Sequence, residues 1–270
     1  MLINSVIIVL REVLEASLMT SLLLALSYIL KIRTKWFLAA ISLGIIGAAV
    51  YAYYLTSVSQ WLDGTGQEIV NASMQYLIYG LLLFIICLIV SDNYTLAGLP
   101  VLPIAMAVTV GLSIAREGSE IIIYVYSFIV STELIGNILV GSLFGAGIGV
   151  SVGALFYYAI VSRETRTVMV TALILLSLVA GGMISQATQL LVQADWLPST
   201  QPVWDFSTVI AETSVVGQLL YALIGYEATP SLIQVIFYTF SLIVIAVVVG
   251  VIYFRKLQSM RRRLFDANDS

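Results

Sequence analysis

The charged segment Arg11-Glu12-Val13-Leu14-Glu15 interrupts an apolar run from Met1 to Leu30. Each charge near a bilayer centre costs about 2.5–3.5 kcal/mol on insertion scales, so three charges in one membrane-length helix need compensation. The pattern R-E-x-x-E returns 105 residues later as Arg116-Glu117-Gly118-Ser119-Glu120, again within an apolar run. On a helix, the two glutamates of each copy share a face, and the arginine can pair with the second glutamate. We therefore expect two helices to meet and combine four carboxylates in one cation site.

The composition is that of an all-α polytopic membrane protein. Of 270 residues, 60% are hydrophobic and 10% are charged, and the mean hydropathy is +1.04, whereas soluble domains carry about 25% charged residues. Cys87 is the single cysteine, which excludes an intrachain disulfide. The chain has no histidine, which excludes histidine-ligated haem, facial-triad iron and Glu-x-x-His di-iron sites. Arg11 and Glu12 interrupt any signal-peptide core, so we expect the first helix to be retained.

Seven apolar segments are long enough to be transmembrane helices. We place them at about 3–30, 36–57, 69–90, 101–130, 136–161, 168–192 and 231–254. Residues 193–230 form the longest predicted loop, and its segment 207–224 has helical spacing but is too polar to span. This pattern predicts an interfacial or re-entrant helix. Residues 255–270 are predicted to form a basic cytoplasmic tail.

The basic residues predict the orientation. Ten of the twelve Lys and Arg lie outside the two motifs: three follow the first helix, two follow the fifth and five are in the tail. With seven spans, all ten fall on one side of the membrane. The positive-inside rule then places the C-terminus in the cytoplasm and the N-terminus outside the plasma (inner) membrane.

The 105-residue offset also suggests two inverted repeats of three helices each, 1–100 and 101–192, with the seventh helix outside the repeat. Small residues at every fourth position of the second and fifth helices show the same offset: Ala40, Gly44 and Ala48 against Gly145, Gly149 and Gly153. Such residues let helices approach closely in lipid, and ordinary close packing also explains them. Inverted repeats with a site at their interface are a common transporter plan.

The chemistry of the motifs indicates a hard cation. Carboxylate oxygens from Glu12, Glu15, Glu117 and Glu120 suit ferric iron, calcium, manganese or magnesium, whereas thiolate and imidazole ligands are absent from the motifs. Arg11 and Arg116 would balance the charge when no metal is bound. The alternative is a purely structural clamp of crossed salt bridges, although buried charge is a poor stabiliser compared with apolar packing.

Other polar residues are candidates for a path to and from this site. Interhelical hydrogen bonds or an ordinary solvated surface are the competing explanations. The candidates are Asn71 and Gln75 on the third helix, Gln186 and Gln189 on the sixth, Glu133 outside, and Asp92 as an exit ligand on the inner side.

The two motifs, in the first and fourth of seven spans with the N-terminus outside, resemble those of the oxidase-dependent iron permeases. That family includes the fungal high-affinity iron permeases and the bacterial Efe-type iron permeases. Its usual motif is Arg-Glu-Gly-Leu-Glu, so the charged positions match here and the spacers match in part. The resemblance implies import of iron across the plasma membrane, with the four glutamates as ligands. It also implies delivery by a partner oxidase, peroxidase or periplasmic iron-binding protein.

We therefore expect a transporter, not an enzyme, with iron as its transported substrate and no bound organic cofactor. Its expected partners are membrane lipid and an extracytoplasmic delivery protein, with no nucleic acid. One alternative is a proton-coupled transporter of another divalent metal such as lead, which related members are credited with taking up, or manganese. The other is a membrane scaffold held by a structural Arg/Glu clamp.

Overall fold

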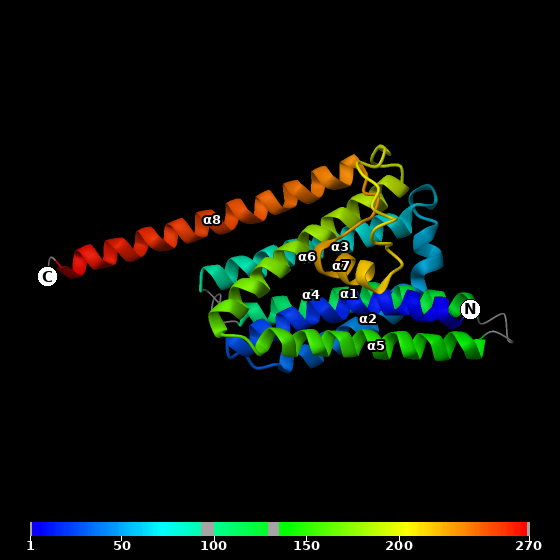
Figure 1. Ribbon diagram of the computed structural model, residues 1–270, viewed down its shortest axis with the longest axis horizontal. Coiled ribbons are helices and arrows are strands. Elements are labelled where there is room, and N and C mark those ends of the chain that lie inside the picture. Colours follow the sequence, from blue (N-terminus) through cyan, green and yellow to red (C-terminus); the bar gives the residue numbers. More distant parts are fainter. Residues whose placement is uncertain (1, 93–99, 129–134, 269–270) are drawn as a thin grey trace.

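The computed structural model describes residues 2–92, 100–128 and 135–268, with side chains as far as residue 258. These parts of the chain form eight α-helices and no β-strand, which confirms the predicted all-helical class (Figure 1). The helices are α1 (Leu2–Ile29), α2 (Lys35–Ser59), α3 (Gly66–Val90), α4 (Val101–Ser127), α5 (Ile135–Val161), α6 (Thr165–Gln193), α7 (Val215–Ile224) and α8 (Leu232–Asn268).

Six helices in the described parts of the chain are long and apolar enough to cross a membrane. They are α2 to α6 and the segment Leu232–Gln258 of α8. The protein is therefore a multi-pass membrane protein. Helix α1 is not among the six, but it has 28 residues and packs along the candidate span α5.

Two sequence-based boundaries are wrong. Residues 207–214 form turns, and the helix predicted from residue 207 begins only at Val215, where the Ser214 side chain accepts a hydrogen bond from Gly217 N at 3.0 Å. The turn begins where Asp205 accepts hydrogen bonds from both the backbone and the hydroxyl of Ser207, which competes with helix formation. At the other end of the chain, α8 continues beyond residue 254, because the basic segment that follows has no glycine or proline to end it.

The helices pack in pairs. Helix α1 lies along α5, α2 lies along α4, and α1 and α4 contact each other between the two pairs. Helices α3 and α6 form a third pair, in which α3 rests on α4 and α6 rests on α1. Helix α8 packs against α6 and α3, and short α7 packs against α6 and α1 (Figure 1).

Glycines permit the close approach of these pairs. A methyl group on Gly145 of α5 would lie 2.6 Å from the carbonyl oxygen of Val6, and one on Gly44 of α2 would lie 2.5 Å from Ile114 Cβ. Both distances are too short for a real side chain. The packing of α5 on α1 and of α2 on α4 therefore depends on small residues, as is usual in membranes.

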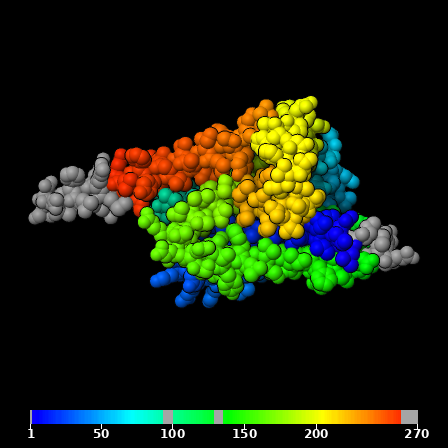
Figure 2. Space-filling model, in the orientation of Figure 1, coloured from blue at the N-terminus to red at the C-terminus, as the bar shows by residue number. Residues whose placement is uncertain are grey.

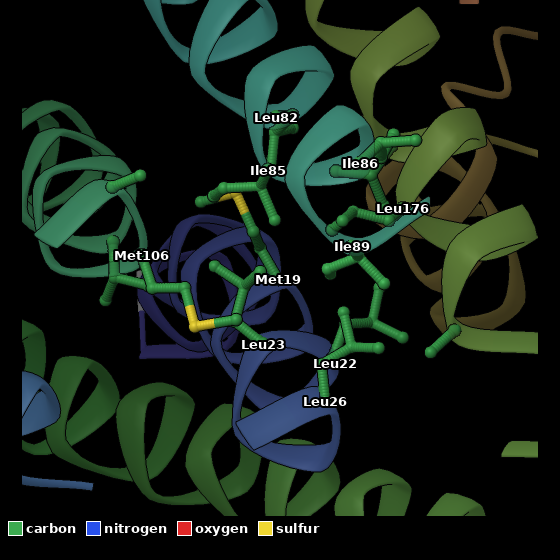
Figure 3. Close-up of a cluster of buried hydrophobic side chains, with 14 of the residues drawn as sticks. Met19, Leu22, Leu23, Leu26, Leu82, Ile85, Ile86, Ile89, Met106 and Leu176 are labelled. Atoms are coloured by element: carbon green, nitrogen blue, oxygen red, sulfur yellow. The ribbon is translucent and has the colours of Figure 1, made fainter. Parts of the chain in front are cut away.

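An apolar core joins α1, α3, α4 and α6 in one half of the bundle (Figure 3). Its members follow Glu15 on α1 and precede Arg116 on α4, so it occupies the half where α1 and α3 end and α4 and α6 begin. The core includes Met19, Leu22, Leu23, Leu26, Leu82, Ile85, Ile86, Ile89, Met106 and Leu176. Apolar side chains therefore fill the space between the four helices in this half of the bundle.

The two ends of the bundle differ in charge. Helices α1, α3, α5 and α8 all end at the same end of the molecule (Figure 1). We call this the basic end, because five basic residues lie in the connections there or at the first residues of the helices that follow: Lys31, Arg33, Lys35, Arg163 and Arg166. Lys256 of α8 forms an ion pair with Asp92, just after α3, at this end. At the opposite end, the segment between α6 and α8 lies beside the start of α1 (Figure 2).

Candidate metal site

Three carboxylates meet where α1 and α4 contact each other. Glu12 and Glu15 come from one face of α1 and Glu117 from α4, and one oxygen of each lies within 4.8 Å of the others. Their exposed fractions are 8%, 3% and 2%. A compact set of carboxylate oxygens is the environment that hard metal ions prefer.

Arg116 lies at the centre of this cluster and joins the two motifs. Its Nη1 atom is 2.5 Å from Glu117 Oε1 and 3.7 Å from Glu15 Oε2, and its Nη2 atom is 3.7 Å from Glu120 Oε1. Arg116 is 6% exposed. The guanidinium therefore neutralises part of a shared negative charge, and it links α4 to α1.

Arg11, the equivalent residue of the first motif, lies differently. Its side chain is 44% exposed, and its Nε atom is 3.8 Å from Glu15 Oε1. The guanidinium carbon lies 4.2 Å from the centroid of the Tyr221 ring in α7, in cation–π geometry. The two arginines are thus not equivalent: one is buried among carboxylates and the other is held at the edge by α7.

The buried charges do not balance. Among the described residues, Glu12 forms no ion pair, and Glu117 Oε2 has no hydrogen-bond partner. The four motif glutamates face two guanidiniums, of which only that of Arg116 is buried, so two negative charges stay uncompensated if all groups are ionised. Uncompensated buried charge is costly, so the cluster favours a bound cation or protons.

Two glutamines extend the site to α3 and α6. Gln186 of α6 accepts hydrogen bonds at its side-chain oxygen from Gln75 Nε2 at 2.6 Å and from Arg116 Nη1 at 3.4 Å. Its amide nitrogen donates to Glu15 Oε2 at 3.2 Å. Both glutamines are buried. Gln186 therefore contacts both motifs and one residue of α3.

Glu120 lies apart from the three clustered carboxylates. Its side chain is 32% exposed, and it lines a polar cavity of about 320 Å³ formed by the start of α3 and the ends of α4 and α6. We call this cavity the vestibule; its lining residues include Glu68, Asn71 and Gln193. Asn71 donates to Glu120 Oε1 at 3.5 Å and accepts from the Tyr51 hydroxyl at 2.9 Å. The fourth glutamate thus joins the buried cluster to a cavity.

A second cavity, of about 510 Å³, reaches the cluster from another side. It lies between the α1–α5 and α2–α4 pairs, and Glu12 and Glu117 line one end of it. We call it the apolar groove, because most of its other lining residues are apolar, among them Ala16, Ile121 and Ala154.

The remaining sequence candidates lie elsewhere. Gln189 is exposed on α6, and Asp92 is paired with Lys256 at the basic end. Glu133 lies outside the described residues.

Sequence reasoning did not identify Tyr51, Glu68 or Tyr221 as neighbours of the site. Glu68 carried a usable signal, since it is a carboxylate at the start of a span, whereas the two tyrosines are ordinary membrane-protein residues by sequence.

Comparisons with known proteins bear on this geometry. Residues 102–262 match the family described as the Iron permease FTR1 family. No curated protein and no solved structure matches the chain. The family match covers more than half of the chain and includes the second R-E-x-x-E copy together with Gln186 and α7. The chain therefore belongs to the iron permease FTR1 family.

Proposed function

We propose that this permease imports ferric iron across the plasma membrane and that Glu12, Glu15 and Glu117 bind the ion on its way. The observation that carries the proposal is the approach of these three buried carboxylates to within 4.8 Å of one another. A multivalent cation would neutralise the excess negative charge of these carboxylates. The ion is the transported substrate, and the proposal includes no organic cofactor.

The access route in this proposal begins at the vestibule. Glu68 and Glu120 would attract the ion there, and Glu120 would pass it to the cluster beside Arg116. The vestibule is at the end of the bundle opposite the basic end, since α3 begins there. With the basic end in the cytoplasm, according to the positive-inside rule, the vestibule opens outside. An extracytoplasmic oxidase, peroxidase or iron-binding protein would then deliver iron to it.

The packing supports inverted repeats of α1–α3 and α4–α6, with α1 as the first of seven spans. The contact of α1 with α5 has a counterpart in that of α4 with α2, and the contact of α3 with α4 has one in that of α6 with α1. Such exchanged contacts are what two repeats related by a twofold axis would produce. In this arrangement the carboxylate cluster lies at the repeat interface, where transporters of this plan bind substrate.

A purely structural clamp is the competing explanation, since Arg116 does cross from α4 to Glu15 of α1. A clamp requires matched charges, however, and Glu12 has no ion-pair partner among the described residues. Retaining this extra carboxylate in a buried position is costly without a cation to bind.

Uptake by purified protein in liposomes tests the proposal. Ferric iron, ferrous iron, lead and manganese would be supplied outside, with and without a proton gradient. We expect iron to accumulate and Glu117→Gln to abolish the uptake while the protein still folds. Uptake of lead or manganese in preference to iron would favour the alternative transporter. Wild-type protein that folds but moves no metal would favour the clamp.

A further inference from the structure

We propose that the apolar groove is a binding site for lipophilic organic cations, with an ammonium group at Glu12 and Glu117 and an apolar chain along the groove. The ligand class is a primary amine on a single unbranched alkyl chain. Binding of such an amine does not depend on the proposed iron transport. Only the expectation that the amine and iron compete for Glu12 and Glu117 rests on that function.

The length and shape of the groove suit a chain. Its lining residues on α1 recur on one face from Glu12 to Leu24, which corresponds to about 18 Å at the helical rise per residue. The volume of about 510 Å³ lies within the range of about 300–1,000 Å³ that is typical of small-molecule pockets. An extended dodecyl chain has a comparable length.

The serine and threonine hydroxyls that line the groove are not free to compete with an alkyl chain. Ser17 donates to the carbonyl oxygen of Gly149 at 3.0 Å, Ser21 to that of Gly153 at 2.7 Å, and Thr20 to that of Ala16 at 2.6 Å. These hydroxyls are therefore satisfied by the backbone. The remaining walls are largely aliphatic and aromatic, including Ile114 and Tyr157.

The end of the groove at Glu12 and Glu117 provides the opposite charge. Glu12 and Glu117 are 8% and 2% exposed, and Glu117 Oε2 has no hydrogen-bond partner among the described residues. A primary ammonium has three donors for these oxygens and would compensate part of the uncompensated charge. A neutral head group would leave the negative charge uncompensated, and an anionic head group would be repelled by it.

The groove is open along α5, where Val150 and Tyr158 line it and are 60% and 69% exposed. Both belong to a candidate membrane span, so this opening faces lipid. A lipophilic cation dissolved in the bilayer therefore reaches the carboxylates sideways, without passing the vestibule.

The test is a binding measurement with labelled dodecylamine on protein in nanodiscs at neutral pH, where the amine is charged. We expect saturable binding of one molecule per chain, displaced by unlabelled dodecylamine but not by dodecanol or dodecyl sulfate. Glu117→Gln should weaken binding about tenfold or more, the loss expected for a hydrogen bond to a charged group.

Ala154→Trp should fill the groove and abolish binding, whereas Leu155→Trp, on the lipid-facing side of the same helix, should leave it intact. If Ala154→Trp does not fold, Ile41→Trp fills the groove from α2.

Displacement by dodecanol as effective as that by the amine would overturn the proposal, because any apolar chain would then suffice. Unchanged binding in the filled variants would also overturn it. Saturable binding without iron uptake would sustain this site and contradict the transport function.

Discussion

Arg116 Nη1 lies 3.7 Å from Glu15 Oε2 and thereby connects the two R-E-x-x-E motifs across the contact between α4 and α1. No reciprocal ion pair from Arg11 to Glu120 is found among the described residues; Arg11 is instead stacked on Tyr221. The two motifs have the same charged residues, yet one arginine is a central counter-ion and the other is a peripheral one.

Arg116→Ala should therefore destabilise the protein far more than Arg11→Ala. Loss of Arg116 removes the buried counter-ion of the three carboxylates and leaves only half-exposed Arg11 beside Glu15. Breaking a buried ion pair in this way costs about 3–5 kcal/mol. Loss of Arg11 removes a half-exposed cation–π contact, worth about 0.5–2 kcal/mol. Thermal unfolding of both variants in detergent measures the difference, and Arg116→Lys should recover part of the transport.

Equal loss of stability in the two alanine variants would contradict this asymmetry. A large loss in Arg11→Ala alone would mean that α7, through Tyr221, holds the bundle together. The variant Tyr221→Leu separates these cases, because it removes the aromatic ring that Arg11 contacts and keeps Arg11 itself.

Gln186→Leu should lower transport per folded molecule, because it leaves Glu15 and Gln75 without their shared hydrogen-bond partner. Each buried polar group left unsatisfied costs about 1–3 kcal/mol. Gln189→Leu is the matched control, since Gln189 is exposed on the same helix. We expect normal transport in the control, and equal transport in both variants would remove Gln186 from the site.

The meeting of the two motifs was predictable from the sequence, because charges inside an apolar run are costly and a second copy at a fixed spacing indicates a partner. The difference between Arg11 and Arg116 was not predictable. It depends on Tyr221, which is more than 200 positions after Arg11 in the chain and arrives on a short helix. Gln186 was identified as a polar candidate, but its contact with both motifs required the packing of α6 on α1.

The glycine contacts give the proposed repeat a different register from the one that the sequence indicated. Gly44 contacts Ile114 and the carbonyl of Gly111, and Gly145 makes the equivalent contacts with Val9 and Val6. These contacts match Gly44 with Gly145, about one helical turn from the Gly149 that the 105-residue offset indicated. A shift of four residues keeps the same face of a helix, so the pattern of small residues alone cannot detect it.

Glu227 should make stability depend on pH. Burial raises the pKa of this carboxyl to about 7, although both of its oxygens accept hydrogen bonds from Gln234 Nε2. Glu212 raises the pKa further and Arg11 lowers it. A raised pKa means that the folded protein holds the proton more tightly than the unfolded chain. Its stabilising contribution is thus complete below about pH 4.5 and is lost as the pH rises through about 7.

Glu227→Gln should consequently unfold at a higher temperature than the wild type at alkaline pH, and the two should converge in mild acid. Thermal unfolding at a series of pH values measures this difference. Asp63→Asn, at an exposed carboxylate between α2 and α3, is the control and should follow the wild type. An advantage of Glu227→Gln that does not change with pH would show that ionisation is not its cause.

Glu68→Gln and Glu120→Gln should raise the iron concentration needed for half-maximal uptake more than they lower the maximal rate. Both carboxylates line the vestibule, where they would concentrate cations by charge before the ion reaches the cluster. The effect should weaken at high salt, since partly exposed charges are screened. Initial rates at several iron and salt concentrations measure both quantities. A pure loss of maximal rate in Glu68→Gln would place that residue in the transport step instead.

The sharpest test of a shared site compares single and double changes among the glutamates. Glu15→Gln and Glu117→Gln should each abolish most transport, because each removes both a ligand and its negative charge. The double variant should be little worse than either, since ligands of one ion act as a unit. Glu68→Gln, in the vestibule, should instead combine with Glu15→Gln nearly additively. Expression should persist in all these variants, because removing a buried carboxylate also removes a desolvation cost. Additive losses for Glu15 and Glu117, with two ions bound per chain, would mean that each motif holds its own ion.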